Sequence, residues 1–356
     1  MNLLEELAGL APDELADHTA GKKRIPGRVA HIDADFIAYI IAADTVAEQR
    51  GERPMRDIGF KRGQVHDFAE YIAGQAGAEH YVLHITPAGS TKGGRPAQAV
   101  QQEYQANRQG RDAPADLHTI RDYIASFGPK AAVHVDQEAD DGLAQANYND
   151  PKNAVLCSRD KDLQMVPGLH LDMDTGEIIN VPFDAYGKLA IDDSKSSKKV
   201  VGYGPAFFFA QCLMGDTADN IKGLPLVPAR AALKVKPSAT FTKDVEAYKA
   251  AKAKGHETNA KFALERVNSH LVKAKSCGPV MTYDLLKDIT NVYDAFQFVK
   301  QLYVDLAEQH EYEYVHWRTG EVVQPMQALL GEMQLLWMRR NKNPLDVVEF
   351  IKENKK

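Results

Sequence analysis

The chain has 356 residues, of which 44% are hydrophobic and 26% are charged, and its formal net charge is −6. This composition is typical of a globular protein with a sizeable core, and the negative sum excludes a globally basic surface for nucleic acid. Its three cysteines form no C-x-x-C pair, which argues against a disulfide framework. No apolar run approaches the ~20 residues that span a bilayer, and the N-terminus is acidic, so we expect a cytoplasmic protein without a membrane partner.

Apolar runs and helical periodicity predict strands that alternate with helices, followed by a mainly helical C-terminal region. This alternation favours an α/β fold with a mostly parallel central sheet flanked by helices. The expected strands are 28–32, 80–85, 131–135 and 153–158, with a β-hairpin over 169–181. The expected helices lie within 1–27 and at 36–49, 64–77, 97–107, 115–127, from Glu138, and at 206–214, 226–236, 283–310 and 324–340. Residues 182–204 read as a polar connector and 237–262 as a Lys- and Ala-rich insertion.

Asp33 follows the first predicted strand at the point where the chain turns into a helix. In open parallel sheets, ligands bind in the crevice beyond the carboxyl ends of the strands. An aspartate at this position also caps helices commonly, so the residues leave capping and ligand binding equally open.

A dense acidic cluster, Glu138-Ala139-Asp140-Asp141, follows the strand 131–135. On a helix Glu138 and Asp141 share a face, and Asp140 is rotated from them by about 100°, which places it at a neighbouring point of the same pocket. An acidic first turn is also favoured by the helix dipole, so a purely structural role stays open.

Two further acidic pairs continue this pattern. Asp160 and Asp162 follow the strand 153–158 and would point the same way in an extended segment. Converging carboxylates raise each other's pKa or require cations, and oxygen-only sites favour Mg²⁺ or Mn²⁺. We therefore hypothesise a metal-dependent site for phosphodiester cleavage. Its candidate metal ligands are Asp33, Glu138, Asp140, Asp141, Asp160, Asp162, Asp216 and Asp219.

Basic residues lie in two segments of the chain. Lys92, Arg95, Arg108 and Arg111 surround Tyr104, a combination that suits a single-stranded backbone with a base stacked on the ring, although a solvated basic loop is the alternative. The second segment is a predicted helix, tight loop and helix. Helix N-termini bind phosphate, so this segment suggests DNA contact through the backbone, and its basic residues are Lys222, Arg230 and Lys234.

Taken in this order, the motifs resemble the metal-dependent 5′-nucleases, which include phage 5′–3′ exonucleases, the 5′-nuclease domain of bacterial DNA polymerase I and flap endonucleases. The resemblance spans roughly residues 28–236. Ile32-Asp33-Ala34 is similar to the motif of the first metal aspartate, and Tyr39 to the aromatic that stacks on the terminal base. The other matching motifs are Tyr104–Arg108, similar to the Tyr-Lys-Ala-Asn-Arg signature of the helical arch, Glu138–Asp141, Asp160 with Asp162, and Gly215–Pro225.

The resemblance implies a PIN-like nuclease core at 28–204 with a helical arch near 87–115. It also implies a helix-three-turn-helix element at 205–240, an N-terminal extension at 1–27 and a mainly helical region at 241–356. The implied cofactors are two Mg²⁺ or Mn²⁺ ions, with K⁺ at the DNA-binding turn, and the implied partner is DNA with 5′ ends or flaps, or an RNA–DNA hybrid, bound by a monomer. Besides the acids, Lys92 and Arg108 would be catalytic, and the implied DNA contacts are Tyr39, Arg95, Tyr104, Arg108, Arg111, Lys222, Arg230 and Lys234.

The chain departs from the family pattern at three places. Gln105 replaces the arch lysine, Ser90 and Thr91 stand where an aspartate is frequent, and Leu226-Val227-Pro228 replaces the glycines of the turn that would hold K⁺. Three rival functions therefore stay open: a PIN-like ribonuclease, a structure-specific DNA-binding protein with impaired catalysis, and a small-molecule phosphatase.

Overall fold

The computed structural model of the chain describes residues 22–110, 112–183, 185–194, 196–228, 231, 239–272 and 277–355. These residues form two compact units, each assembled from segments that are far apart in the sequence. The first unit contains the residues up to Arg95 together with Arg108–Ala185 and Met338–Asp346, and the second contains Pro96–Asn107, Tyr186–Trp337 and the residues from Val347 onward. The helix predicted within 1–27 falls on residues before Lys22, outside the described part.

A six-stranded sheet forms the centre of the first unit, with the strand order β3-β2-β1-β4-β5-β6. Neighbouring strands are parallel except β5 and β6, which form the predicted hairpin. The predicted α/β class with a mostly parallel sheet is therefore confirmed. The strands are β1 (Ile25–Asp33), β2 (Ala78–Ile85), β3 (Ala131–Val133), β4 (Ala154–Cys157), β5 (Gly168–Leu171) and β6 (Ile178–Val181).

The two faces of β1 serve different purposes, because successive side chains of a strand point to opposite faces. Ala30 and Ile32 are fully buried in the main apolar core. His31 and Asp33 alternate with them, and Asp33 lies opposite His84 of β2 in the register. His31 and Asp33 thus lie on the face away from this core.

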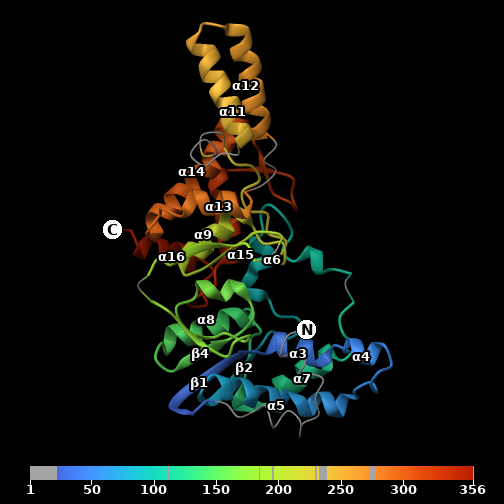
Figure 1. The fold of residues 1–356 in the computed structure, drawn as a ribbon. Coiled ribbons are helices and arrows are strands. Elements are labelled where there is room, and N and C mark those ends of the chain that lie inside the picture. The colour runs from blue at the N-terminus through green and yellow to red at the C-terminus, as the bar shows by residue number, and fades with distance from the viewer. Residues whose placement is uncertain are drawn as a thin grey trace. The chain divides into compact units, whose positions relative to one another are not determined.

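Helices cover the sheet on both faces (Figure 1). The helices α3 (Ala34–Ala42), α5 (Ile58–Gln75) and α7 (Leu117–Ala125) contribute to the core on the Ala30 face. The helix α8 (Ala139–Asn149) packs on the opposite face. Burial of apolar area on the first face, at about 25 cal/mol per Å², stabilises this layer, so the second face is available for polar groups.

The helix predicted over 36–49 is broken in the structure. It ends at Ala42, and a separate short helix, α4 (Val46–Gln49), begins after Thr45. Thr45 and Glu48 form a reciprocal capping box, with Thr45 Oγ1 accepting from the Glu48 amide and Glu48 accepting from the Thr45 amide. A cap of this kind starts a new helix, and apolar spacing alone does not reveal it.

The second unit is mainly helical. Its core contains Phe208, whose ring meets those of Phe209 and Trp337 edge to face with centroids 5.0 Å apart in each pair.

The helix predicted over 283–310 consists of two helices in the structure, because Asn291 caps the start of the second one. The predicted connector at 182–204 contains a hairpin of β7 (Lys188–Asp192) and β8 (Lys199–Tyr203). The remaining elements are α9 (Pro205–Met214), α11 (Ala239–Ala253), α12 (Glu257–Val272), α13 (Pro279–Leu286), α14 (Val292–His310), β9 (Tyr314–Val315), β10 (Val322–Val323), α15 (Pro325–Leu336) and α16 (Asp346–Glu353).

The expected helix over 97–107 is reduced to two short pieces, α6 (Arg95–Gln98) and a 3₁₀ turn, η2 (Ala106–Arg108). Gln105 has a left-handed φ of 57°, which an α-helix cannot contain. Within the described residues 87–110 there is consequently no long arch helix. The second helix expected at 226–236 falls mostly outside the described part, so the helix-three-turn-helix element stays a prediction.

Candidate functional site

Asp33 ends β1 and caps α3. Its Oδ1 accepts a hydrogen bond from the Phe36 amide at 3.1 Å, and its Oδ2 accepts one from Ser158 Oγ at 2.8 Å. The capping interpretation is therefore correct, but capping alone does not explain the electrostatic environment of Asp33. Burial, followed by the charge of Asp35, raises the pKa of Asp33 from 3.8 to about 7. An ordinary cap would leave a carboxylate fully ionised at neutral pH.

Asp140 lies in the first turn of α8 and is half-buried. Burial raises the pKa of this carboxyl well above its ordinary value, and the charges of Asp160 and Asp33 raise it further, followed by Glu138 and Asp35. The structure thus brings together five carboxyl groups, from the end of β1, the first turn of α3, the start of α8 and the segment after β4. Four of them were predicted as ligands, and Asp35 is an addition.

Ser158 connects two of these acids. Its hydroxyl donates to Asp33 Oδ2 and accepts a hydrogen bond from the Asp160 amide at 3.0 Å. Asp160 in turn accepts from the Asp162 amide at 2.8 Å and caps a 3₁₀ helix, η4 (Lys161–Met165). Sequence reasoning gave Ser158 no role, although its position directly after a buried strand was visible.

The segment after β4 is not extended, which corrects the expectation that Asp160 and Asp162 point the same way. Asp162 is 5% exposed and lies inside η4, with its Oδ1 2.7 Å from Lys161 Nζ. An intervening turn destroys the two-residue alternation on which the expectation depended.

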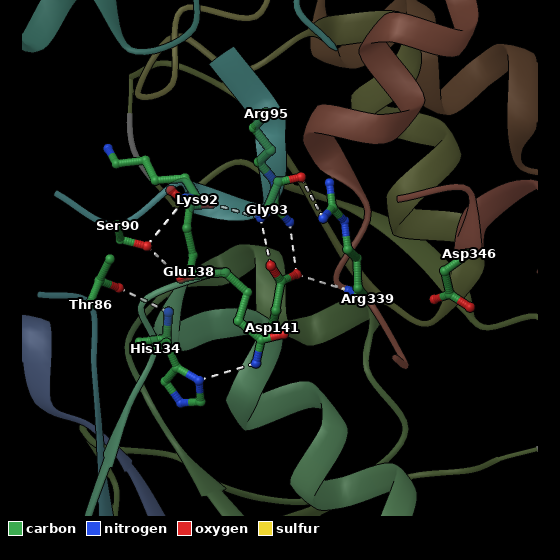
Figure 2. A network of polar contacts seen from close by, with 12 residues as sticks. Thr86, Ser90, Lys92, Gly93, Arg95, His134, Glu138, Asp141, Arg339 and Asp346 are labelled. Carbon is green, nitrogen blue, oxygen red and sulfur yellow. Dashed lines mark hydrogen bonds and ion pairs between the residues drawn. The ribbon is translucent and has the colours of Figure 1, made fainter. Parts of the chain in front are cut away.

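Asp141 belongs to a buried ion pair (Figure 2). Arg95 Nη1 and Nη2 lie 2.7 and 2.8 Å from its two oxygens, and the Arg339 amide donates to Oδ1 at 3.1 Å. Burial alone would raise the pKa of Asp141, but the Arg95 charge and hydrogen bonds outweigh it, so the pKa is lowered. Arg95 Nη1 also lies 2.9 Å from Glu138 Oε2. The carboxylate predicted to bind metal is therefore held by arginines.

This ion pair also corrects the prediction that Arg95 contacts DNA. The residue is 1% exposed, and its guanidinium is enclosed with two carboxylates. A charge is buried only when it is paired and hydrogen-bonded, and Asp141 and Glu138 provide that pairing. Arg95 therefore has a structural role in the buried ion pairs with Asp141 and Glu138 and is not accessible at the surface.

In the second unit, the segment Glu103–Asn107 packs on the turn that carries Asp219. Tyr104 Oη donates to Asp219 Oδ2 at 3.3 Å, and Gln105 Nε2 donates to Oδ1 at 3.0 Å. The Gln105 amide also donates to the Asp219 carbonyl at 2.9 Å. Tyr104, predicted to bind DNA, is only 7% exposed as a result. Asp216 of the same turn accepts from the Ala218 amide at 2.8 Å.

The other predicted contact residues differ in accessibility. Tyr39 is 54% exposed, and Arg108 is exposed as well. Lys92 is half-buried with a left-handed φ of 50°, and Lys222 Nζ lies 3.0 Å from the Tyr312 hydroxyl. Arg111, Arg230 and Lys234 lie outside the described residues.

Three histidines form a hydrogen-bonded row between the sheet and α8. His31 Nδ1 lies 2.9 Å from His84 Nε2, and His84 Nδ1 lies 3.0 Å from His134 Nε2. Gln137 Nε2 lies 3.1 Å from His134 Nδ1. Because the Gln137 amide can only donate there, each ring must carry its proton on Nε2 and accept on Nδ1. Gly142 of α8 makes room, since a Cβ there would come within 2.2 Å of the His134 ring.

Burial lowers the pKa of all three histidines. For His31 it falls from 6.5 to about 4, with Asp150 as the opposing charge. Around His134 the opposing charges are Asp141 and Asp136, whereas Lys342 acts in the same direction as burial. The row is therefore neutral at physiological pH. The three histidines lie in or just after the neighbouring strands β1, β2 and β3. Their positions are visible in the sequence, but only the register of the strands shows that their side chains meet.

The acidic group suits a divalent cation by charge and donor type. Burial and the neighbouring carboxylates raise the pKa values of Asp33 and Asp140, whereas Arg95 lowers that of Asp141. Asp35 of the same group is paired with Arg121, whose Nη2 lies 2.7 Å from its Oδ1. Carboxylate oxygens are the ligands of Mg²⁺ and Mn²⁺. As the described side chains stand, however, no three His, Cys, Asp or Glu residues converge closely enough to hold a metal ion.

Among the described residues, no helix is both long and apolar enough to cross a membrane.

No protein-family model matches the chain, and no curated protein matches it either. A solved structure that is similar is the T5 D15 protein co-crystallized with metal ions, at 12% sequence identity and a TM-score of 0.36. That similarity covers 80% of this chain and 94% of the other.

Proposed function

We propose that this chain is a metal-dependent 5′-nuclease, which hydrolyses phosphodiester bonds of DNA from 5′ ends or flaps in replication or repair. The observation that carries the proposal is geometric: Asp33 and Asp160 meet at the Ser158 hydroxyl, and Asp140 lies close enough for the charges of both to act on it. These groups lie at the carboxyl ends of parallel strands, where open α/β sheets bind their ligands. The ordered acidic and basic motifs of the sequence give the substrate class.

Asp33, Asp140 and Asp160 would hold the first ion, with Glu138 beside them. The second ion expected from the motifs at Asp162, Asp216 and Asp219 stays a prediction from the sequence. We leave Asp141 out of the proposed ligands because both its oxygens already accept hydrogen bonds from Arg95 and the Arg339 amide. Bound Mg²⁺ or Mn²⁺ would supply activation of water and stabilisation of the leaving oxygen. Raised pKa values of Asp33 and Asp140 are then expected in the metal-free chain.

The chain's own residues would orient the substrate. Tyr39, exposed on α3 just after Asp33, presents a ring on which an unpaired terminal base can stack. Lys92 and Arg108 would neutralise the scissile phosphate, since cations near transferred phosphoryl groups stabilise the transition state. K⁺ at the turn after Pro225 would have to bind without the glycines usual there.

One observation favours a second candidate, a structure-specific DNA-binding protein with impaired catalysis. Asp219 already accepts hydrogen bonds on both carboxylate oxygens, and one donor is Gln105, where related enzymes carry a lysine. This candidate predicts binding of flapped DNA without turnover in Mn²⁺. A PIN-like ribonuclease, which shares the acidic sheet edge, would cleave RNA in preference to DNA.

The test is release of labelled nucleotides from 5′-labelled blunt, nicked and flapped DNA with Mg²⁺, Mn²⁺ or chelator. We expect cleavage that needs the divalent ion and that Asp140→Asn lowers by roughly 100-fold or more, as expected for a group acting directly on a metal. Asp122→Asn, an exposed aspartate on α7, is the matched control and should cleave normally. Undiminished cleavage by Asp140→Asn would refute the proposal.

A further inference from the structure

Residues Met338–Asp346 belong to the first unit, although the residues on both sides of them in the sequence belong to the second. We call this segment the strap. It closes on Asp346, which is fully buried and accepts from the Arg340 amide at 2.7 Å and from Asn341 Nδ2 at 3.1 Å. These hydrogen bonds fix the backbone next to Arg339, which contacts other residues of the first unit.

Arg339 contacts two segments of the candidate site, and Figure 2 shows it beside Gly93 and Asp141 with a dashed line to each. Its amide donates to Asp141 Oδ1 at 3.1 Å, and its Nη1 donates to the Gly93 carbonyl at 2.8 Å. The residue is 3% exposed. Arg95 pairs with the same aspartate, so two guanidinium groups and the carboxylates of Asp141 and Glu138 form a buried group with no formal net charge.

The loop Ser90–Arg95 is tied down on its other side as well. Ser90 Oγ donates to the Gln137 carbonyl at 2.9 Å, the Thr91 amide to the Val135 carbonyl at 3.0 Å, and the Gly93 amide to the Asp136 carbonyl at 3.1 Å. Lys92 lies between these anchors. The Arg339 side chain connects this loop to the strap.

We propose that Arg339 is a positioning residue for the proposed hydrolytic site, holding the loop that carries Lys92 and the first turn of α8 that carries Asp140 in one arrangement. The inference rests on the proposed function and adds to it a group from the far end of the chain. Arg339 acts through neighbours of the proposed groups. Its partner Asp141 is not itself a proposed ligand but follows Asp140, and its partner Gly93 follows Lys92. Residues that orient metal ligands commonly change metal affinity or activity by 10- to 100-fold. The strap thus makes residues near the C-terminus part of the site's support.

Gly93 offers a test that leaves Arg339 in the chain. A Cβ at Gly93 would lie 2.2 Å from Arg339 Nη1, so Gly93→Ala displaces the guanidinium. Gly93 also has a φ of 65°, and alanine there is strained in any case. Gly89→Ala is the matched control, because Gly89 has a φ of 79° with no atom within 4 Å of its Cβ position. The two variants share the strain and differ in the contact.

The experiment compares the full-length wild type with Arg339→Met, Arg339→Lys, Gly93→Ala, Gly89→Ala and Lys342→Ala. Lys342 forms an exposed ion pair with Asp136 in the same strap, and such pairs contribute little. Three quantities are measured: hydrogen exchange of peptides covering 89–95 and 138–143, Mn²⁺ affinity by electron paramagnetic resonance, and kcat and KM on flapped DNA.

We expect Arg339→Met and Gly93→Ala to accelerate exchange in both peptides and to weaken Mn²⁺ binding by roughly 10-fold, with the loss in kcat exceeding that in KM. Arg339→Lys should restore part of each, because its ammonium can still donate to the Gly93 carbonyl. Lys342→Ala should match the wild type, and Gly89→Ala should show only the change that the backbone strain causes, without the loss of Mn²⁺ binding. Exchange that rises uniformly over the whole chain, or that stays unchanged in Arg339→Met, would overturn the inference. A wild type that binds Mn²⁺ but cleaves no DNA would instead refute the proposed function.

Discussion

Arg95 holds both carboxylate oxygens of Asp141, at 2.7 and 2.8 Å, in an interior where neither side chain is more than 1% exposed. Asp140, the preceding residue, is half-buried among four other carboxyl groups and has a raised pKa. Two adjacent acids thus have opposite electrostatic surroundings. This difference predicts opposite consequences for their removal.

Asp141→Asn should destabilise the protein strongly, by about 3–5 kcal/mol, because it leaves the buried charge of Arg95 without its main partner. Asp140→Asn should instead leave the metal-free protein as stable as the wild type or more so, since it removes a repelled charge. Chemical denaturation with chelator at neutral pH measures both. Equal destabilisation by the two variants would contradict the assignment of Asp141 to structure and Asp140 to the site.

Asp33 should make stability depend on pH. Its pKa is about 7 in the folded chain and 3.8 as an ordinary carboxyl. Between these values the unfolded chain releases a proton that the folded chain keeps. The contribution of Asp33 is therefore complete below 3.8 and is lost as the pH rises through about 7.

The measurement is the difference in unfolding free energy between Asp33→Asn and wild type across this range. Asparagine can still cap α3, so the variant isolates the charge. Without metal, the difference should move in favour of the variant as the pH rises. Mn²⁺ above pH ~7 should stabilise the wild type and leave the variant unaffected, because the variant lacks the ligand. A pH-independent difference would argue against the shared acidic environment.

The histidine row should make the protein sensitive to acid. The pKa of His31 is lowered from 6.5 to about 4 and that of His84 falls well below 6.5, so an unfolded chain takes up protons before the folded one does. The contribution of the row is complete above pH 6.5 and is lost as the pH falls toward about 4.

His84→Gln tests the row at its centre. Its loss of buried hydrogen bonds should cost about 1–3 kcal/mol at neutral pH. Below pH 6.5 the variant should lose less stability than the wild type, because one proton-binding group is gone. His80→Gln, at an exposed position of the same strand, is the control. If the two histidine variants show the same pH profile, the row has no special role.

Gln105→Ala removes one of the two donors to the Asp219 carboxylate, and we expect a loss of about 1 kcal/mol in unfolding free energy. Tyr104→Phe removes the other donor, at a longer distance, and should cost less. The variants share an acceptor, so their effects should not add, and a double-mutant cycle measures the coupling. Strict additivity would show that the two contacts act separately.

The sequence alone determined where the strands and helices alternate, and it located Asp33, Asp140 and Asp160 next to strand ends or a helix start. Those features follow from local periodicity and from the order of neighbouring residues, which a single segment contains. It also indicated the hairpin of β5 and β6. The capping box at Thr45 was present as a local Thr-x-x-Glu pattern, but the apolar spacing that runs through it predicted one continuous helix. The turn that separates Asp160 from Asp162 was not foreseen.

Only the tertiary structure decided which charges are paired. Arg339 and Asp141 are 198 residues apart in the sequence, and no local sequence pattern predicts their contact. The same is true of Gln105 and Asp219, which lie 114 residues apart. Whether a carboxylate lies next to an arginine or next to another carboxylate depends on how distant segments pack. In a low-dielectric interior, the neighbouring charge determines the pKa of the carboxyl group and therefore whether it forms an ion pair or remains available to bind a cation. The fold thus separated Asp140 from Asp141, which the sequence presented as equals.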